Sequence, residues 1–510
     1  MLHVWNWQCW TILILSTCHI SSSYRLYMEI MKCAYGERGS LTATCTNVNT
    51  ASFFKSTSYR FDHLDETLQC QNCSLKTVEP NTFDISGNQI KRLILKNSNI
   101  NELQQRAFVG LVFLRDLDLS SNNIKMIHPG TFAGVKKIEL VNLKNNSLVL
   151  LSNDGFVELG NLDTLVLSEN KIAVLELNAF NGLKNLRVLR LNQNQITNVT
   201  AVFNNLTSLQ YLDLSDNSIS TLKGVEFENL TSLLELNFDR NKIKSLPSLE
   251  FNCMSNLELL GLSNNLITTI EASAFQGLNK LETLDLGNNQ ISTVPEKTFR
   301  SLYNLINMNL TGNLLDVFQL SRFAGLPKLR ILNISRNQIE DIDVTGIFPL
   351  HDLHTLDLSF NNLTDLNYVI LLHRMPRLSY LALQNNYWPC DLEDDMNKYF
   401  SGENFKFILF DNKNGSIICN ENFKKEAKEE KIDAIQRVYQ LTVDETTHSS
   451  MIILYLIVIV LAVVVVLLSI GQYRISKELH FNSILPRRRA TSEVKLLQSD
   501  IREEENDFMR

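Results

Sequence analysis

Glycine, proline and basic charge are all scarce in this sequence. Its 510 residues include 19 glycines and 9 prolines, too few for a flexible low-complexity linker chain. Lysine and arginine number 48 against 55 aspartates and glutamates, which gives a formal net charge of −7. The sequence also has no glycine-rich phosphate loop. Because phosphate backbones require a basic surface, nucleic acid is not an expected partner.

Most of the sequence consists of one repeated pattern. The pattern L-x-x-L-x-L-x-x-N-x-L returns fourteen times, almost always 24 residues apart. Its asparagine slot holds, in order, Cys73, Ser98, Asn122, Asn146, Asn170, Asn194, Asn217, Asn241, Asn265, Asn289, Asn313, Asn337, Asn361 and Asn386. Repeats of this length join a short strand to a return segment, and stacking buries an apolar face that no repeat buries alone. The sequence therefore predicts an α/β leucine-rich repeat solenoid, a horseshoe with short parallel strands on its concave face.

The residues around each asparagine predict which face is core. Before Asn217, strand alternation turns Leu212 and Leu214 inward and leaves Asp213 and Ser215 facing outward. The asparagine amide can both donate and accept where the strand turns away, so its predicted role is structural. A second core column is predicted from phenylalanines at the same period: Phe108, Phe132, Phe156, Phe180, Phe203, Phe227, Phe251, Phe275, Phe299 and Phe323.

Outward carboxylates are the candidates for catalysis. They are Asp116, Asp118, Asp213, Glu235, Asp239, Asp285 and Asp357. An open sheet does not desolvate them, so their pKa values have no reason to shift, and no nucleophile, base and oxyanion donors converge. They are interpreted as a solvated face. The sequence predicts a binding protein rather than an enzyme, with no cofactor.

Both ends of the chain point to a membrane. Residues 10–20 are largely apolar and are followed by three serines, which predicts a signal peptide over residues 1–23. Residues 451–470 form an uncharged run of 20, enough for an α-helix to cross roughly 30 Å of hydrocarbon. Lysines and arginines cluster after this run and none lie in residues 444–450. We expect a single-pass type I protein of the plasma membrane, with extracellular repeats and a cytoplasmic tail.

These signals give the expected organisation of the chain. The predicted order is signal peptide (1–23), N-terminal cap (24–67), about fourteen leucine-rich repeats (68–389), C-terminal cap (390–422), membrane-proximal stalk (423–450), transmembrane helix (451–470) and cytoplasmic tail (471–510).

Cysteine positions fit an oxidising compartment and two stapled caps. The ends of a solenoid expose core and need covering. Cys33 and Cys45 precede the first repeat, whereas Cys390 and Cys419 follow the last. Their positions predict one disulfide in each cap.

Three further cysteines leave alternatives open. Cys70 and Cys73 form a C-x-x-C, but they fill an inward slot and the asparagine slot of the first repeat. Packed thiols or a cap disulfide are expected there, in preference to a redox or zinc site, and no metal is predicted. Cys253 is then left over. It is either an interchain disulfide or a buried packing thiol.

The last repeat carries a resemblance to a known family. It runs into Asn386, Trp388, Pro389, Cys390 and Asp391. Together with the regular repeats and paired cap cysteines, this resembles arthropod extracellular leucine-rich repeat receptors, closest to the membrane-spanning form of the mosquito leucine-rich immune proteins. The resemblance covers roughly residues 30–425. Secreted members carry a long C-terminal coiled coil that this chain replaces with a membrane helix, and the tail is too short for the signalling domain of Toll-type receptors.

Two functions follow as hypotheses. The first is a cell-surface receptor or co-receptor, implied by the resemblance to act in innate immunity, that binds a protein or microbial ligand. The second is an adhesion or structural protein that acts by homophilic or cell-to-cell contact, and a homodimer fits either hypothesis. Clustering of ectodomain-coated beads would favour adhesion.

The ligand is expected on adjacent inner strands of the fifth to eighth repeats. The candidate residues are Arg190, Tyr211, Asp213, Asp216, Glu235, Asp239 and Arg240. Tyrosine and arginine are common interface anchors, and the acids favour a partner with a basic patch. The alternative is a merely solvated face with the ligand on a flank or cap.

Glycosylation is predicted on the extracellular part of the chain, and phosphorylation on the cytoplasmic tail. Glycosylation sequons stand at Asn145, Asn198, Asn205, Asn229, Asn309, Asn333, Asn362 and Asn414, and a ninth at Asn72 has cysteine as its middle residue. Asn309 and Asn333 take outward slots on neighbouring inner strands, where glycans would cover the concave face. In the tail, Thr491 and Ser492 follow an arginine cluster that resembles a basophilic kinase site, although a plain stop-transfer cluster also explains the arginines.

Overall fold

The computed structural model describes residues 33–35, 41–55, 65–225, 227–343, 350–401 and 406–408. All of them belong to one compact unit, Met1–Asn420. The predicted signal peptide, membrane helix, tail, Cys419, Asn414, Thr491 and Ser492 lie outside the described residues. Within the described ranges, no helix combines the length and the apolar character needed to cross a membrane.

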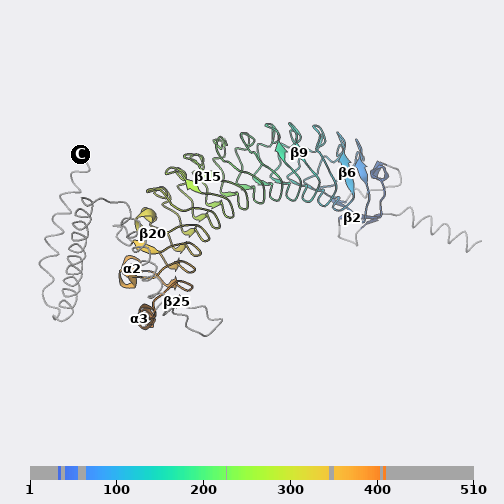
Figure 1. Cartoon of the computed structure of the whole chain (residues 1–510). Helices are drawn as coiled ribbons and strands as arrows, with labels where there is room; N and C mark the ends of the chain where they lie inside the picture. Colours follow the sequence, from blue (N-terminus) through green and yellow to red (C-terminus); the bar gives the residue numbers. More distant parts are fainter. Residues whose placement is uncertain are drawn as a thin grey trace, which may run out of the picture. The chain divides into compact units, whose positions relative to one another are not determined.

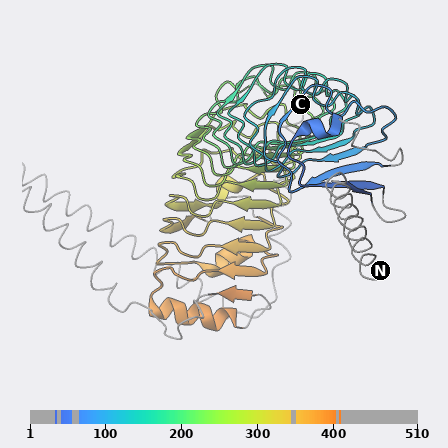
Figure 2. The ribbon, with the colours of Figure 1, turned by 90° about the vertical axis from the view of Figure 1, so that its right-hand side faces the viewer.

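Each repeat contributes one short strand to a long sheet on the inner side of the arc of repeats (Figures 1 and 2). Neighbouring strands are parallel, and β1 (Cys33–Tyr35) adds an antiparallel edge to β2. In order along the sheet, the parallel strands are β2 (Thr42–Thr46), β3 (Thr67–Gln71), β5 (Arg92–Ile94), β7 (Asp116–Asp118), β8 (Leu140–Asn142), β10 (Thr164–Val166), β12 (Val188–Arg190), β13 (Tyr211–Asp213), β14 (Glu235–Asn237), β16 (Leu259–Gly261), β18 (Thr283–Asp285), β19 (Asn307–Asn309), β21 (Ile331–Asn333), β23 (Thr355–Asp357), β24 (Tyr380–Ala382) and β25 (Lys406–Ile408).

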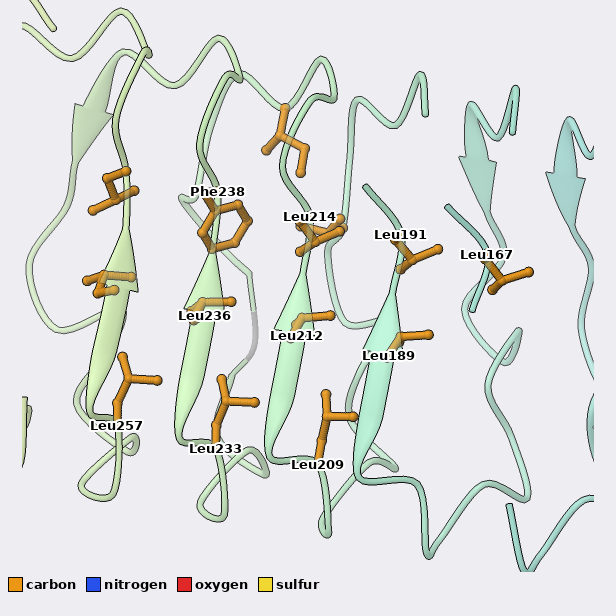
Figure 3. Packing of buried hydrophobic residues seen from close by; sticks show 14 of the residues in the cluster. Leu167, Leu189, Leu191, Leu209, Leu212, Leu214, Leu233, Leu236, Phe238 and Leu257 are labelled. Carbon is orange, nitrogen blue, oxygen red and sulfur yellow. The ribbon is translucent and has the colours of Figure 1, made fainter. Parts of the chain in front are cut away.

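The register of this sheet stacks equivalent leucines. Leu189 pairs with Leu212, and Leu212 with Leu236. The buried middle residues of adjacent strands therefore lie side by side. Figure 3 shows these side chains in one row, with Leu214 and Phe238 in the next row. The ten phenylalanines of the return segments are all buried, as predicted. Seven pairs of rings stack at centroid distances of 5.8–6.2 Å, among them Phe108 with Phe132.

The asparagine ladder forms as predicted. Asn241 donates from Nδ2 to the carbonyls of Leu214 and Phe238, at 2.9 and 3.0 Å. Its Oδ1 accepts from the backbone N–H of Ile219 at 3.0 Å. One amide thus satisfies backbone groups of its own and the preceding repeat where the strand ends. The same pattern recurs from Asn122 to Asn386.

The outer side of the repeats carries little regular structure. Four two-stranded parallel sheets lie there among the described residues, formed by β4 (Lys76–Val78) with β6 (Ile100–Leu103), β9 (Leu150–Leu151) with β11 (Val174–Leu175), β15 (Ser245–Leu246) with β17 (Thr269–Ile270), and β20 (Val317–Gln319) with β22 (Asp341–Asp343). Two short helices, η2 (Leu320–Phe323) and α2 (Tyr368–Arg374), complete the return segments. Asn367 caps α2 by accepting from the N–H of Ile370 at 3.1 Å.

Disulfides staple the two ends. Cys33 is bonded to Cys45, as predicted, and joins β1 to β2. Cys70 is bonded to Cys73, which decides between the packed thiols and the cap disulfide. Helix η1 (Ala51–Lys55) places Phe54 at the head of the phenylalanine column.

At the other end, α3 (Cys390–Phe400) covers the last repeat. Trp388 is buried before it and donates to the carbonyl of Leu383 at 3.0 Å. Cys390 is disulfide-bonded. Its predicted partner, Cys419, lies outside the described residues.

Candidate ligand-binding face

The outward aspartates and asparagines at the strand ends belong to the scaffold. Asp213 Oδ1 accepts from the backbone N–H of Ser215 at 3.0 Å and from its hydroxyl at 2.7 Å. The same backbone cap, two residues on and 2.8–3.1 Å long, is made by Asp118, Asn142, Asp213, Asn237, Asp285, Asn309, Asn333 and Asp357. Four of the predicted outward carboxylates, those of Asp118, Asp213, Asp285 and Asp357, therefore do more than face solvent, since each also fixes the turn that follows its strand.

Gly261 interrupts this series, and Asp239 compensates. Gly261 has no side chain to cap Ser263, so Asp239 of the preceding repeat accepts from the Ser263 N–H at 2.7 Å. A Cβ at Gly261 would stand 3.0 Å from Oδ1 of both Asp239 and Asn237, which shows how closely they lie over it. Burial in this position raises the pKa of Asp239, and nearby Asp285 adds to that effect. Asp239 is thus a partly buried structural carboxylate.

A hollow of about 530 Å³ opens on the inner sheet around β12, β13 and β14. Short side chains at Val166 and Val188 occupy outward slots, whereas the longer Arg190, Tyr211 and Glu235 stand nearby and are exposed. The hollow is lined by Lys144, Val166, Ser168, Val188, Leu189, Arg190, Asn192, Tyr211, Leu212, Asp213, Glu235, Asn237 and Leu259. It therefore offers apolar surface together with two carboxylates, those of Asp213 and Glu235, and two basic side chains, those of Lys144 and Arg190.

Four of the predicted site residues line this hollow: Arg190, Tyr211, Asp213 and Glu235. Register pairs Arg190 with Asp213, and Tyr211 with Glu235, on adjacent strands. Tyr211 is 37% exposed, so its ring is available to a ligand while its strand stays fixed by the core. Asp239 lies beyond the lining residues.

Asp216 and Arg240 are also outside the lining, at the turns that follow β13 and β14. Arg240 Nε and Nη2 donate to the two carboxylate oxygens of Asp216, at 2.6 and 2.8 Å. This bidentate hydrogen bond raises the pKa of Arg240. The two charges satisfy each other, which leaves them less able to anchor a partner than Arg190 and Glu235, which are exposed in the hollow.

Sequence reasoning missed the apolar part of the hollow. Val166, Val188 and Leu259 fill outward slots that carry polar residues in many other repeats. Lys144 also reaches the rim, where its Nζ lies 2.9 Å from Glu169 Oε1. A run of short apolar residues in the outward slots of adjacent repeats is the signal that could have predicted the hollow.

The two inner-face sequons are neighbours, as predicted. Asn309 pairs with Asn333 across β19 and β21. Asn309 Nδ2 donates to Asp285 Oδ1 at 2.9 Å. Asn145, Asn198, Asn205 and Asn229 are exposed, and Asn362 is half-buried. Use of these sequons stays a prediction.

Cys253 is an unpaired thiol and is half-buried. It donates to Asn252 Oδ1 at 3.1 Å. The interchain disulfide stays a prediction. In the described ranges, no group of three or more histidine, cysteine, aspartate or glutamate residues is arranged to hold a metal ion.

Comparison with known sequences identifies the repeats. The family described as Leucine rich repeat matches residues 66–124, 88–148, 113–172, 136–196, 160–219, 199–243, 235–291, 280–339 and 327–387. These matches run together from residue 66 to residue 387, more than half of the sequence. The chain belongs to the leucine rich repeat family. No curated protein sequence matches this leucine-rich repeat chain.

Solved structures share its fold. The Toll–Spatzle complex of Drosophila aligns with 22% identity and a TM-score of 0.57, over 68% of this chain and 51% of that chain. The APL1 leucine-rich repeat domain aligns with 20% identity and a TM-score of 0.52, over 70% and 90%. The TLR13–ssRNA13 complex aligns with 24% identity and a TM-score of 0.51, over 68% and 57%.

At these identities the likeness shows the fold alone. This leucine-rich repeat chain spans a little over half of the length of the TLR13 and Toll chains. The likeness supports the predicted resemblance to extracellular leucine-rich repeat receptors at the level of the repeats. The closeness to the membrane-spanning mosquito form stays a prediction.

Proposed function

We propose that this protein is a single-pass cell-surface leucine-rich repeat protein that binds a protein or microbial ligand, as an innate-immune receptor or co-receptor. The single observation that carries the proposal is the hollow at β12–β14, which gathers an exposed tyrosine, an arginine, a lysine and two carboxylates beside apolar side chains. Tyrosine and arginine beside desolvated apolar surface are the usual anchors of a binding hot spot.

The surroundings of the hollow favour a basic protein surface as the ligand. The hollow is lined by Asp213 and Glu235 together with Lys144 and Arg190, and further along the sheet stand Asp285 on β18 and Glu258 and Glu282 just before β16 and β18. Acidic surface attracts and orients a partner of opposite charge. In the solved complexes, Toll is bound to Spatzle and TLR13 to a single-stranded RNA. The acidic character here disfavours RNA, whose phosphates would be repelled.

The proposal includes the membrane topology expected from the sequence. Residues 1–23 would direct secretion, residues 451–470 would span the bilayer, and the tail would face the cytoplasm. Protease added to intact cells should remove the repeats of a chain that carries a C-terminal tag and leave the tag protected. Protection of the repeats in intact cells would contradict this topology.

The ligand proposal can be tested on cells that display the full chain. Labelled extracellular proteins and bacterial surface preparations are applied, and any captured component is titrated against variants. Tyr211→Ala should weaken its binding by about 30-fold, the effect of losing one hot-spot side chain of about 2 kcal/mol. Arg240→Glu should weaken it less, because Arg240 is paired with Asp216 outside the hollow.

Ile331→Ala is the matched control for Tyr211→Ala. Ile331 occupies the same outward slot on β21 and is 43% exposed. It lies away from the hollow, so its truncation should leave binding unchanged. If the Tyr211 variant and the wild type bind equally at equal surface levels, the ligand does not bind at the hollow. Clustering of chain-coated beads without any ligand would favour the adhesion alternative instead.

A further inference from the structure

The five-residue sequence F-N-N-L-T occurs twice in this chain, at residues 203–207 and 360–364. In each copy the second asparagine begins an N-glycosylation sequon. The two copies take different positions in the repeat. Phe203 belongs to the phenylalanine column of the core and is 1% exposed, whereas Phe360 is 38% exposed. The same sequence thus buries one phenylalanine inside the solenoid and places the other on its surface.

Phe360 occupies a slot that disfavours large side chains. The slot lies directly before each ladder asparagine, and its φ is positive in every repeat of the ladder, 56° at Phe360. This left-handed conformation suits glycine, asparagine and aspartate and is costly for bulky residues. In the other repeats the slot holds asparagine, serine, glutamate, glutamine, aspartate, arginine or glycine. A phenylalanine kept in such a conformation indicates a contact that compensates for its cost.

Neighbouring repeats fix the position of this ring. The guanidinium carbon of Arg336, from the same slot of the preceding repeat, lies 4.2 Å from the centroid of the Phe360 ring. It covers one face of the ring. On the other side, the Phe360 N–H donates to the carbonyl of Gln384 in the following repeat at 2.9 Å. The ring is therefore held at the edge of the stack with one face covered and the rest available.

A second exposed aromatic lies close to the same sequon. Asn361 is buried, so Phe360 and Asn362 both lie on the outside of one turn. Tyr387 fills the slot of Asn362 in the following repeat and is 48% exposed. The N–H of Tyr387 donates to the carbonyl of Leu363 at 2.9 Å, which places the two turns side by side. Asn362 is thus flanked by two aromatic residues.

The side-chain amide of Asn362 is not used by the scaffold. Within the described part of the chain it makes no hydrogen bond, and Thr364, which completes the sequon, is exposed. The sequon at Asn309 differs, because Asn309 Nδ2 donates to Asp285 Oδ1 at 2.9 Å and its Oδ1 accepts from the Thr311 N–H at 3.0 Å. A sugar is attached through Nδ2. At Asn362 this atom can carry the sugar without the loss of a structural bond.

We propose that Asn362 carries an N-linked glycan whose first N-acetylglucosamine packs against Phe360 and Tyr387, so that the sugar forms part of the surface of the last repeats. One face of this sugar ring presents only C–H groups. Such a face gains dispersion contact with an aromatic ring and loses no hydrogen bond. The contact offsets the cost of a phenylalanine at positive φ and explains why Phe360 stands where the other repeats hold polar residues or glycine.

The linkage needs a sugar donor of the secretory pathway, a lipid-linked oligosaccharide diphosphate. Asn362 Nδ2 attacks the anomeric carbon of the first sugar, and a C–N bond forms while the bond from that carbon to the phosphate oxygen breaks. The bonding electrons leave with the lipid diphosphate, and the amide loses one proton. Because this reaction takes place only on secreted or luminal chain, the inference rests on the proposed extracellular placement of the repeats.

Mass spectrometry of the full chain, expressed in eukaryotic cells and purified in detergent, gives the first test. The peptide that contains Asn362 should carry a glycan. Glycans at other sequons together with a bare Asn362 would overturn this inference and leave the membrane topology standing. A chain without a glycan at any sequon would overturn both.

Hydrogen exchange at the Tyr387 N–H gives the second test. Thr364→Ala removes the sequon and keeps both Asn362 and Phe360, and it should speed exchange about fivefold, as expected for one lost ring contact. Phe360→Asn should speed exchange by a similar factor in the glycosylated chain. In the Thr364→Ala chain the same substitution should cause no further loss, because no sugar is left to contact the ring. An equal effect of Phe360→Asn in both chains would overturn the inference.

The first copy of the sequence is the matched control. Thr207→Ala removes the sequon at Asn205, where Phe203 is buried and cannot reach a sugar. Exchange at the Leu209 N–H, which donates to the Leu206 carbonyl at 3.1 Å, should be unchanged. A loss of protection there equal to that at Tyr387 would show that a glycan stabilises its repeat without a ring contact, which would also overturn the inference.

Discussion

The interior and the inner surface of this solenoid are built by the same repeat and follow different rules. Inside, each ladder asparagine makes the same bonds to the same backbone positions, from Asn122 to Asn386. On the inner surface, equivalent slots hold tyrosine, glutamate, leucine and threonine on successive strands. The interior repeats because every backbone turn presents the same unsatisfied groups. The surface is free to vary because water satisfies whatever stands there.

Between these extremes lies the capping column at the strand ends. Most of its members are aspartate or asparagine, as the turn requires, yet Gly261 breaks the series and Asp239 takes over the bond to Ser263. At Ser263 the same kind of bond to the backbone N–H is kept, but the carboxylate that accepts it comes from the preceding repeat. Three substitutions test whether stability depends most on the invariant interior and least on the variable surface.

The largest effect is expected in the phenylalanine column. Phe251→Ala would leave a cavity between Phe227 and the neighbouring return segments, because Phe251 is fully buried and stacks on Phe227 at 6.1 Å. The free energy of unfolding of these repeats should fall by about 3–5 kcal/mol. Urea unfolding followed by local hydrogen exchange would measure it. Asn252→Ala, at an exposed neighbour, should cost little, and an equal loss in both variants would contradict a specific role for the column.

An intermediate effect is expected in the ladder. Asn241→Ala would leave the carbonyls of Leu214 and Phe238 and the N–H of Ile219 without this partner. The loss should be about 2–4 kcal/mol, since each buried unsatisfied group costs about 1–3 kcal/mol and some relaxation occurs. Hydrogen exchange at Ile219 reports it directly. Lys242→Ala is the exposed control, and unchanged protection of Ile219 would show that water replaces the amide.

The smallest effect is expected at Asp239, and it depends on pH. Its pKa in the folded chain is raised above the ordinary 3.8, so the folded state holds the proton more tightly than the unfolded state. Stability from this group is then largest at low pH and falls as pH rises from 3.8 through the raised pKa. Asp239→Asn should remove that fall, because an amide oxygen can still accept from Ser263 without ionising.

Thermal midpoints compared from about pH 4 to about pH 7 would measure this difference. Asp357→Asn exchanges the same groups at an ordinary capping position and is the control. A wild type and an Asp239→Asn variant with parallel pH profiles would contradict the assigned pKa direction.

Much of the fold could be predicted because one period governs it. The spacing of asparagines and phenylalanines predicted the ladder and the core column, and both form with the expected members. The pairing of Cys33 with Cys45 followed from their position ahead of the first repeat. The state of Cys70 and Cys73 did not, because buried thiols and a disulfide satisfy the same slots.

The candidate site could be predicted in part. Alternation indicated that Arg190, Tyr211, Asp213 and Glu235 face outward on adjacent strands, and these four line the hollow. It could not indicate that Arg240 closes onto Asp216, or that Asp239 bends over Gly261. Those contacts depend on which neighbouring side chain is absent or oppositely charged.

The sequence by itself determined the repeat, its inward and outward faces and the stacking order, because a 24-residue period leaves each apolar residue one place to be buried. The tertiary structure alone decided that Arg240 pairs with Asp216 and that Asp239 lies over Gly261 and bonds to Ser263. Both are properties of side chains from adjacent repeats, brought side by side by the strands although they lie far apart in the chain. A hollow exists where short residues meet between long ones, and only the stack determines which residues meet.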